Sequence, residues 1–337
     1  MKKKLMALLM VAAMSAMTLA GCGSEGTADN GTVYKVGIVK YVDDACLDQI
    51  EAAIKAELDA KGEELGVTFD YDKYSANGQA DSSVLNQIAA DLVADDVDVI
   101  IPIATPAAMI MQSATEDNQI PVVFSAVSDP VGAGLVESLD APGSNITGTS
   151  DALDTEAVMN LIVTVNPDIK KLGLLYDKSQ DSSDTPITQA KEFCSANGIQ
   201  AVEKTGTTNA ELAAAADALV AEGVDAIFTP TDNTKMTAEL AIFEKFTAAQ
   251  IPHYTGADSF ALNGAFLGYG VNYTELGTAT ADMAVDILVN GVTPETTAVQ
   301  MLDNGIITVN TETAEACGID YSSLGTVVEV VTAESFN

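Results

Sequence analysis

The feature that most constrains this chain is a stretch of sequence that occurs twice. Val97–Met109 reads VDVIIPIATPAAM, and Val224–Met236 reads VDAIFTPTDNTKM, so the two align without a gap. Each is an apolar run with the length of a buried strand, followed by polar residues and the start of a helix. Thr105 in the first copy aligns with Asp232 in the second. We expect these two strand ends to form the two sides of one ligand site.

The duplication extends beyond this stretch. Lys35–Val39 (KVGIV) is similar to Lys171–Leu175 (KLGLL), and Ile120–Val123 (IPVV) is similar to Ile251–Tyr254 (IPHY). Apolar periodicity predicts strands at 34–40, 67–74, 97–103 and 121–125, and again at 171–175, 199–204, 224–229 and 251–254. It predicts helices at 47–66, 80–94, 106–117, 184–197, 209–222 and 234–249. Such alternation is typical of right-handed βαβ units and mostly parallel sheets.

The rest of the chain connects the two halves. We interpret Asn145–Ser150 as a crossover, and Ala265–Gly270 as a strand that returns toward the first half. A helix is predicted at 276–290, a strand pair at 296–309, and a helix plus strand at 311–331 on the second half. The predicted fold class is α/β, with two Rossmann-like lobes whose parallel sheets are joined by a three-segment hinge. The predicted bounds are 33–148 plus about 270–297 for lobe 1, and 149–269 plus about 298–337 for lobe 2.

The N-terminus has the pattern of a targeting signal. Lys2–Lys4 precede the apolar run Leu5–Ala20, and Leu19-Ala20-Gly21-Cys22 resembles the lipobox of bacterial lipoproteins. Residues 1–21 are therefore predicted to be a signal peptide, with Cys22 lipidated and 22–32 a flexible tether. The alternative is an uncleaved membrane anchor, for which the apolar run is short. The mature protein is expected on the outer face of the cytoplasmic membrane, held there by lipid.

Composition and missing motifs exclude several classes of protein. A net charge of −34 argues against nucleic acid and anionic lipid as partners, and the chain has neither Arg nor Trp. The sequence lacks phosphate-binding, dinucleotide-binding, nucleophile-elbow and zinc-protease motifs, so no catalytic residue, metal or cofactor is predicted. The lone His253 is interpreted as a packed residue, and the acidic segment Asp177–Asp184 lacks the calcium-loop pattern. Without C-x-x-C spacing, the disulfide state of Cys46, Cys194 and Cys317 stays open.

Five stretches together resemble one known family. They are Ala76–Asp81 (ANGQAD), Ile103–Ala108 (IATPAA), Phe124–Val136 (FSAVSDPVGAGLV), Asn145–Gly148 (NITG) and Pro230–Thr234 (PTDNT). The chain resembles the extracytoplasmic substrate-binding proteins of ABC importers, in the subgroup that includes tryptophan- and tyrosine-type binding proteins. The resemblance implies a type I periplasmic-binding fold that binds a small ligand between its lobes. It also implies an ABC permease with its ATPase as partners. We expect a monomer that is not an enzyme.

Within this family the expected ligand is an amino acid, with an aromatic or large apolar side chain. Its carboxylate would bind at the helix that starts after Thr105, aided by the Thr105 and Ser125 hydroxyls, although Thr105 could be a plain helix cap. Its ammonium would bind Asp232, which could equally cap the following helix, with Asp258 and Asp129 as second choices. Asp129 could instead form a turn with Pro130. The remaining ligand-binding candidates are Tyr41 and Tyr176 at the cleft rim, and Gln79, Ala107 and Asn233 in the matching stretches.

Two alternatives stay open at this point. The same fold could bind a sugar, a nucleoside or another small solute. It could also present its ligand to a membrane receptor as a sensor. A transcription-factor effector domain shares the fold, but the lipobox and the missing DNA-binding segment argue against that class.

Overall fold

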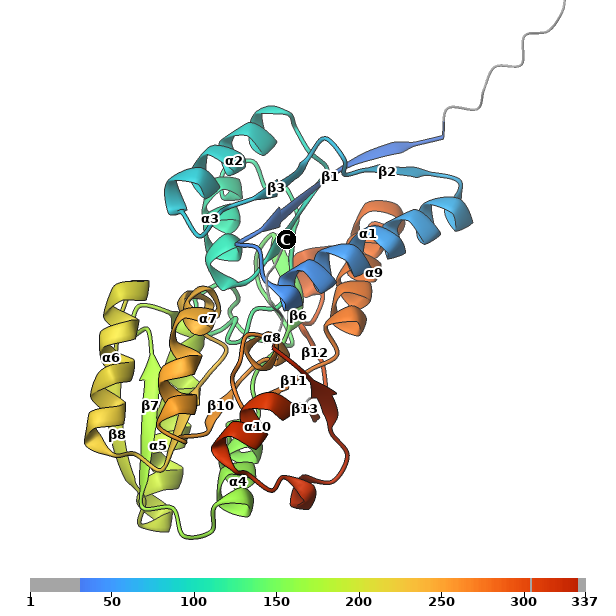
Figure 1. Cartoon of the computed structure of the whole chain (residues 1–337). Helices are drawn as coiled ribbons and strands as arrows, with labels where there is room; N and C mark the ends of the chain where they lie inside the picture. Colours follow the sequence, from blue (N-terminus) through green and yellow to red (C-terminus); the bar gives the residue numbers. More distant parts are fainter. Residues whose placement is uncertain (1–30, 304, 333–337) are drawn as a thin grey trace, which may run out of the picture. The chain divides into compact units, whose positions relative to one another are not determined.

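The computed structural model describes residues 31–303 and 305–332, which carry two seven-stranded sheets with helices packed against them (Figure 1). We call each sheet with its helices a lobe. The first sheet has the order β12-β6-β5-β4-β1-β2, with β3 also paired to β1, and all its strands are parallel. Its strands are β1 (Val33–Lys40), β2 (Thr68–Asp70), β3 (Ser75–Asn77), β4 (Val99–Ile103), β5 (Val122–Phe124), β6 (Ile146–Ser150) and β12 (Gln300–Met301).

The second sheet has the order β14-β13-β11-β10-β9-β7-β8. Only the β11–β13 pair is antiparallel among the described strands of this sheet. The strands are β7 (Lys171–Tyr176), β8 (Gln200–Thr205), β9 (Ala226–Thr229), β10 (His253–Thr255), β11 (Leu267–Gly270), β13 (Ile306–Asn310) and β14 (Val328–Val330). The predicted fold class, two Rossmann-like lobes with mostly parallel sheets, is confirmed.

Helices connect the strands in both lobes. The first lobe contains α1 (Ala45–Leu65), α2 (Ser82–Ala94), α3 (Thr105–Thr115) and α9 (Tyr273–Asn290). The second contains α4 (Thr155–Val165), α5 (Asp181–Asn197), α6 (Asn209–Glu222), α7 (Asn233–Ala248), α8 (Asp258–Leu262) and α10 (Thr311–Cys317). Short 3-10 turns cover Pro294–Thr296 and Ser322–Leu324. Most of the longer helices begin at a side-chain cap, such as Asp44 for α1 and Asp81 for α2, and α1 ends at Gly66 in the left-handed conformation.

Several sequence predictions need correction. Residues 67–74 do not form one strand, because the polar segment after β2 bends in a turn closed by Tyr74 N–H donating to Tyr71 O before β3 begins. Residues 145–150 are not a simple crossover, since Ile146–Ser150 is the buried strand β6. Hydropathy does not predict this strand, because its threonines are polar. In the fold their hydroxyls find partners, as when Thr147 donates to Thr297 O. Helices α4 and α8 were not predicted.

The connections between the lobes also differ in detail from expectation. The predicted strand pair at 296–309 is two strands in different sheets, β12 with β6 and β13 with β11. The strand predicted at 265–270 is β11 and belongs to the second sheet. The chain therefore passes between the sheets after Ser150, after Gly270 and after Met301. The lobe bounds predicted from the sequence remain a proposal; sheet membership alone places β6 and β12 with the first lobe.

The predicted signal peptide at 1–21, with Cys22 and most of the tether, lies outside the described residues. Within the described part of the chain, none of the helices has both the length and the apolar character needed to cross a membrane.

Helices α1 and α9 lie side by side against the first sheet, although they come from opposite ends of the chain (Figure 1). Gly277 makes this approach possible. A Cβ at this position would lie 2.6 Å from Ile50 O and 2.8 Å from Ala53 Cβ. The contact matters for the site, because α9 begins where the chain returns from the second sheet to the first lobe.

We expect Gly277→Leu to lower the free energy of unfolding by about 1–3 kcal/mol, because the new side chain forces α9 away from α1. Urea denaturation followed by circular dichroism measures this. The matched control is Glu275→Leu, which puts the same side chain at an exposed position of α9. Equal stability of the two variants would contradict the close packing of α1 and α9.

Candidate functional site

The carboxyl ends of the two sheets face each other, as contacts between the lobes show. The Thr185 hydroxyl at the start of α5 donates to Asp129 Oδ2 at 2.8 Å. The Cys46 thiol at the start of α1 donates to Asp258 Oδ1 at 2.6 Å. Burial raises the pKa of Tyr41, and the nearby charges of Asp177 and Asp232 raise it further, so Tyr41 of the first lobe lies near both. In open parallel sheets this edge is where ligands bind.

The two contacts between the lobes are reciprocal. Helix α1 follows the first strand of the first lobe, and α5 follows the first strand of the second lobe. Asp129 follows β5, and Asp258 follows β10, which correspond in the duplicated pattern. Each lobe therefore donates a thiol or hydroxyl, from the helix that follows its first strand, to an aspartate of the other lobe. Asp129 and Asp258, chosen together from the sequence, occupy equivalent places in the two lobes.

Helix α3 begins at this edge without a side-chain cap. Ala104 before it has φ 81°, a left-handed conformation that is rare for residues other than Gly. Thr105 is 4% exposed, and its Oγ1 has no hydrogen-bond partner among the described residues. Ala107, two residues further on, is fully buried. An uncapped helix start with an unpartnered hydroxyl suits an anion.

Helix α5 of the second lobe shows the same pattern. Gln180 before it provides no side-chain cap. Ser182 is 2% exposed, and its Oγ has no partner in the described part of the chain. Among the described α-helices of eight or more residues, α3 and α5 are the ones that lack a side-chain cap. Both begin on the edge where the lobes meet.

Asp232 aligns with Thr105 in the duplication, but its surroundings differ. It caps α7, with Oδ1 accepting from Lys235 N–H at 2.9 Å. Oδ2 accepts from Asp177 N–H at 2.6 Å and from the Ser183 hydroxyl at 3.1 Å. Burial raises the pKa of Asp232 to about 6. The carboxylate is 0% exposed and joins the ends of β7 and β9 to the starts of α5 and α7.

Of the other predicted residues, three form hydrogen bonds within their own lobe, and Gln79 is exposed. Ser125, Tyr176 and Asn233 have partners within their own lobe: the Ser125 hydroxyl contacts Thr280 Oγ1 at 2.8 Å, Tyr176 Oη donates to Glu203 at 2.9 Å, and the Asn233 side chain donates to Gln180 at 3.3 Å. Burial raises the pKa of Tyr176, and the hydrogen bond to Glu203 and its negative charge raise it further, to about 12. Gln79 is exposed and has φ 54°, and its N–H donates to Asn77. The structure brings Thr105, Tyr41, Asp129, Asp232 and Asp258 to the interlobe edge.

A cavity of about 310 Å³ lies between the lobes beside the first crossing segment. Its walls are mainly apolar, with a few polar groups that include Asp129 and Ser182. The lining residues are Ser128, Asp129, Pro130, Val131, Leu139, Ala152, Leu153, Ser182, Thr185, Pro186 and Met301. Of these polar groups, Asp129 was among the ligand-binding residues predicted from the sequence. The apolar wall was not predicted, because no periodic pattern marks apolar residues that come from separate loops.

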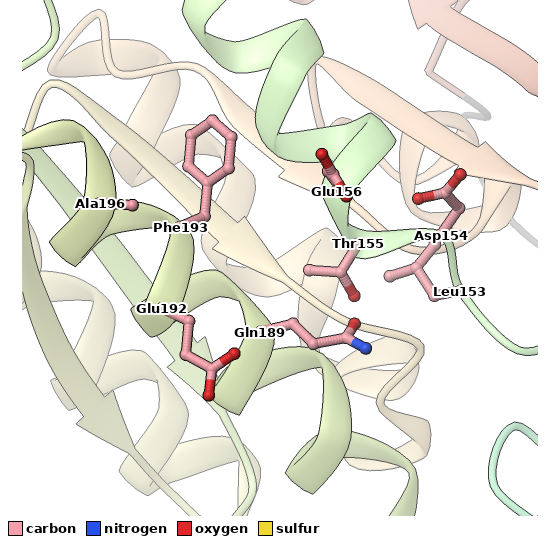
Figure 2. A pocket seen from close by; sticks show the side chains of 8 residues that line it. All are labelled: Leu153, Asp154, Thr155, Glu156, Gln189, Glu192, Phe193 and Ala196. Atoms are coloured by element: carbon pink, nitrogen blue, oxygen red, sulfur yellow. The ribbon is translucent and has the colours of Figure 1, made fainter.

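A second cavity, of about 440 Å³, belongs to the second lobe alone (Figure 2). It lies between the first turn of α4 and the outer face of α5. Carboxylates of Asp154, Glu156 and Glu192 surround it, together with the Phe193 ring. Because one lobe forms all of its walls, movement between the lobes does not shape it. No sequence prediction pointed to this place.

The described residues form no cluster of three or more His, Cys, Asp or Glu side chains that could hold a metal ion. His253 is buried between Glu239 at 2.9 Å and Thr229 at 2.8 Å, inside the second lobe. Cys46, Cys194 and Cys317 are free thiols, and burial raises the pKa of Cys194 to about 11.

Comparison with known proteins places the chain in context. Residues 35–328 match the family model described as ABC transporter substrate binding protein. The chain is 29% identical over 342 residues to a tyrosine-binding protein of Clostridioides difficile strain R20291, covering 99% of this chain and 97% of the relative.

Among solved structures, one similar protein is an ABC domain from Streptococcus pneumoniae in complex with L-Trp. It is 30% identical, has a TM-score of 0.81, and covers 88% of this chain and 100% of that one. Another is the ligand-free, open structure of a substrate-binding protein with adhesive properties from Clostridium difficile. It is 32% identical, has a TM-score of 0.69, and covers 89% of this chain and 100% of that one.

The two TM-scores carry structural information, because identity and coverage are nearly the same for both proteins. The structure described here is closer to the L-Trp complex than to the open form. The contacts between the lobes fit this observation. More distant structures, such as a solute-binding protein from Bacillus halodurans at 16% identity and a TM-score of 0.62, share the fold alone.

Asp232→Ala is expected to destabilise the second lobe. The change removes a helix cap and leaves Asp177 N–H and the Ser183 hydroxyl buried without their acceptor, at a cost of about 2–4 kcal/mol. Chemical denaturation measures the loss. The matched control is Thr208→Ala, which removes the cap of α6 at an exposed position and should cost about 1 kcal/mol. If Asp232→Ala is no more destabilising than Thr208→Ala, Asp232 is free for another role.

Proposed function

The chain belongs to the ABC transporter substrate-binding protein family, and we propose that it binds an amino acid with an aromatic or large apolar side chain between its lobes. It would then deliver this amino acid to the permease of an ABC importer. The tyrosine-binding relative and the L-Trp complex support this solute class. Members of such a family bind and hand over a solute, so the function is binding rather than catalysis.

The observation that carries the proposal is the interlobe cavity of about 310 Å³. Ligand cavities in proteins are typically about 300–1,000 Å³, apolar, with a few polar groups that fix orientation. This cavity is at the small end of that range, which suits a single amino acid. Pro130, Leu139, Leu153, Pro186 and Met301 supply the apolar wall for its side chain.

The polar groups of the cavity match the two charges of an amino acid. We assign the ligand carboxylate to the start of α5, with the Ser182 hydroxyl as a donor, because a chain without Arg must hold anions by N–H groups and hydroxyls. We assign the ammonium to Asp129, which lines the same cavity. Thr105 at the start of α3 offers a second unpartnered hydroxyl on the same edge.

This assignment exchanges the two sides predicted from the sequence. There, the first lobe supplied donors through Thr105 and the second supplied a carboxylate through Asp232. In the cavity, the first lobe supplies the carboxylate of Asp129 and the second supplies the helix start at Ser182. Asp232 supports the site without lining the cavity, because it accepts hydrogen bonds that hold Asp177 and Ser183 in place.

Isothermal titration calorimetry with L-tryptophan, L-tyrosine, L-phenylalanine and L-leucine tests the solute class. We expect micromolar or tighter binding for at least one aromatic amino acid, because the apolar wall and the two charged ends are then all used. Glucose, myo-inositol and adenosine serve as the comparison set. Heat from one of these, with none from any amino acid, would replace the amino acid by that solute class.

Variants of the cavity resolve the assignment further. Ser182→Ala and Asp129→Asn should each weaken binding by about tenfold or more, which corresponds to ~1.4 kcal/mol for a lost charge-assisted hydrogen bond. Thr188→Ala, at an exposed position of α5 outside the cavity, is the control and should leave affinity unchanged. Equal affinity of all three variants would move the ligand elsewhere on the interlobe edge.

The family places the protein outside the cytoplasm, and we propose a lipid anchor at Cys22 as the means of retention. The N-terminal pattern of Lys2–Lys4, apolar run and Leu19-Ala20-Gly21-Cys22 supports this proposal. Cys22→Ser should abolish incorporation of radiolabelled palmitate and release the protein from washed membranes. Labelling that persists in the variant would exclude Cys22 as the modified residue.

A further inference from the structure

The reciprocal contacts between the lobes are chemically unequal, and the difference has a functional meaning. Asp129 is half-buried beside the cavity and accepts from a hydroxyl. Asp258 is also half-buried, but it accepts from the Cys46 thiol, which is itself 1% exposed. Nothing about the amino-acid site requires this second contact, because Cys46 and Asp258 do not line the cavity.

A second carboxylate lies close to the Cys46–Asp258 contact. Asp44 caps α1 and is 3% exposed, with its Oδ1 accepting from Cys46 N–H at 2.9 Å. The charge of Asp258 acts on Asp44, and both charges act on Tyr273 and on Cys46. Two acidic groups from opposite lobes are thus brought together around one thiol.

The groups that face this pair come from each element packed around it. They are Asp44, which caps α1, Cys46 of α1, Asp258 and Ser259 of α8, and Tyr273 of α9, on which the charge of Asp151 after β6 also acts. No Lys is among them in the described part of the chain. Lys40 of β1 instead pairs with Asp43, Asp48 and Glu51. Asp151 and Tyr273 follow the first and second crossings between the lobes, so the cluster lies beside the hinge.

We propose that Cys46 and Asp258 position the lobes in the closed state, and that closure takes up a proton because it brings Asp258 and Asp44 together. Cys46, Asp44 and Asp258 are positioning residues, acting through closure rather than by touching the ligand. The proposal rests on the binding function of the family and not on the identity of the solute.

The direction of the effect follows from burial. In the structure described here burial raises the pKa of Asp44 to about 6 and raises that of Asp258, and the charge of Asp258 opposes ionisation of Asp44. Opening admits water between α1 and α8 and lets both carboxyl groups ionise more easily. The closed state therefore binds protons more tightly than the open state. Its population is highest at acidic pH and decreases as the pH rises through about 6.

Small-angle X-ray scattering of the protein without added solute, from pH 5 to pH 8, tests this directly. The radius of gyration of the wild type should increase with pH as the lobes open. Asp258→Asn and Asp44→Asn should each flatten this increase and keep the protein compact at pH 8. Asn keeps the size of the side chain, and it also caps helices well, so α1 retains its cap.

Two further variants separate the proposal from a general effect of charge. Asp154→Asn replaces a helix-capping carboxylate of α4 away from the contact and should behave like the wild type. Cys46→Ala removes the thiol donor but leaves both carboxylates; it should open more readily at every pH and keep the dependence on pH. If the Asp258 and Asp44 variants change with pH as the wild type does, the proposal is wrong.

A final arm adds L-tryptophan or L-tyrosine at saturating concentration. Compaction at pH 8 by either amino acid would support the proposed solute class. Absence of compaction with both would count against that class alone, because the pH dependence is measured without solute.

Discussion

The structure depends on one constraint: polar groups at the carboxyl ends of the strands must keep partners when the two lobes bury them. An unpaired buried group costs about 1–3 kcal/mol, so each must be satisfied locally, across the interface or by a ligand. Asp232 is satisfied locally by three donors. Asp129 accepts from Gly132 N–H in its own lobe and from Thr185 of the other lobe, and Asp258 accepts from Cys46 of the other lobe. Thr105 and Ser182 find no partner among the described residues, so a ligand that binds them favours closure.

The duplication allows a locally satisfied position and a position left for a ligand to be compared directly. Thr105 and Asp232 stand at the same place in the two copies, after β4 and β9. An aspartate at this position caps the helix that follows it and also accepts from the N–H after the neighbouring strand. Its carboxylate oxygens are then occupied and do not bind other partners. The threonine leaves α3 uncapped. The same position in the two copies is therefore a structural joint in one lobe and an uncapped helix start in the other.

Much of the fold could be predicted because buried parallel strands are apolar runs and the helices between them are amphipathic. Strand β6 was not predicted, because Thr147 and Thr149 are polar and interrupt the apolar run. Inside the fold their hydroxyls form hydrogen bonds, so they can be buried. The site was predictable only in part. Polar residues after strands mark the edge, but whether an aspartate faces a ligand or its own helix depends on neighbours such as Ser183, far away in the sequence. The apolar wall depends on Leu139 and Met301, which come from the loop between β5 and β6 and from β12, far apart in the sequence.

Selectivity follows from the same constraint. A solute that only fills the apolar wall leaves the Ser182 hydroxyl unpaired, and closure around it gains little. A sugar can pair the hydroxyl, but it places its own polar groups against Leu153, Pro186 and Met301, where they lose water without replacement. An apolar amino acid meets both demands, because its charged ends and its side chain point to different parts of the cavity. Under the proposed function, the lobes select the solute whose binding leaves no buried polar group unpaired. Under the proposed proton uptake, the thiol–carboxylate contact beside the hinge determines how readily closure occurs at a given pH.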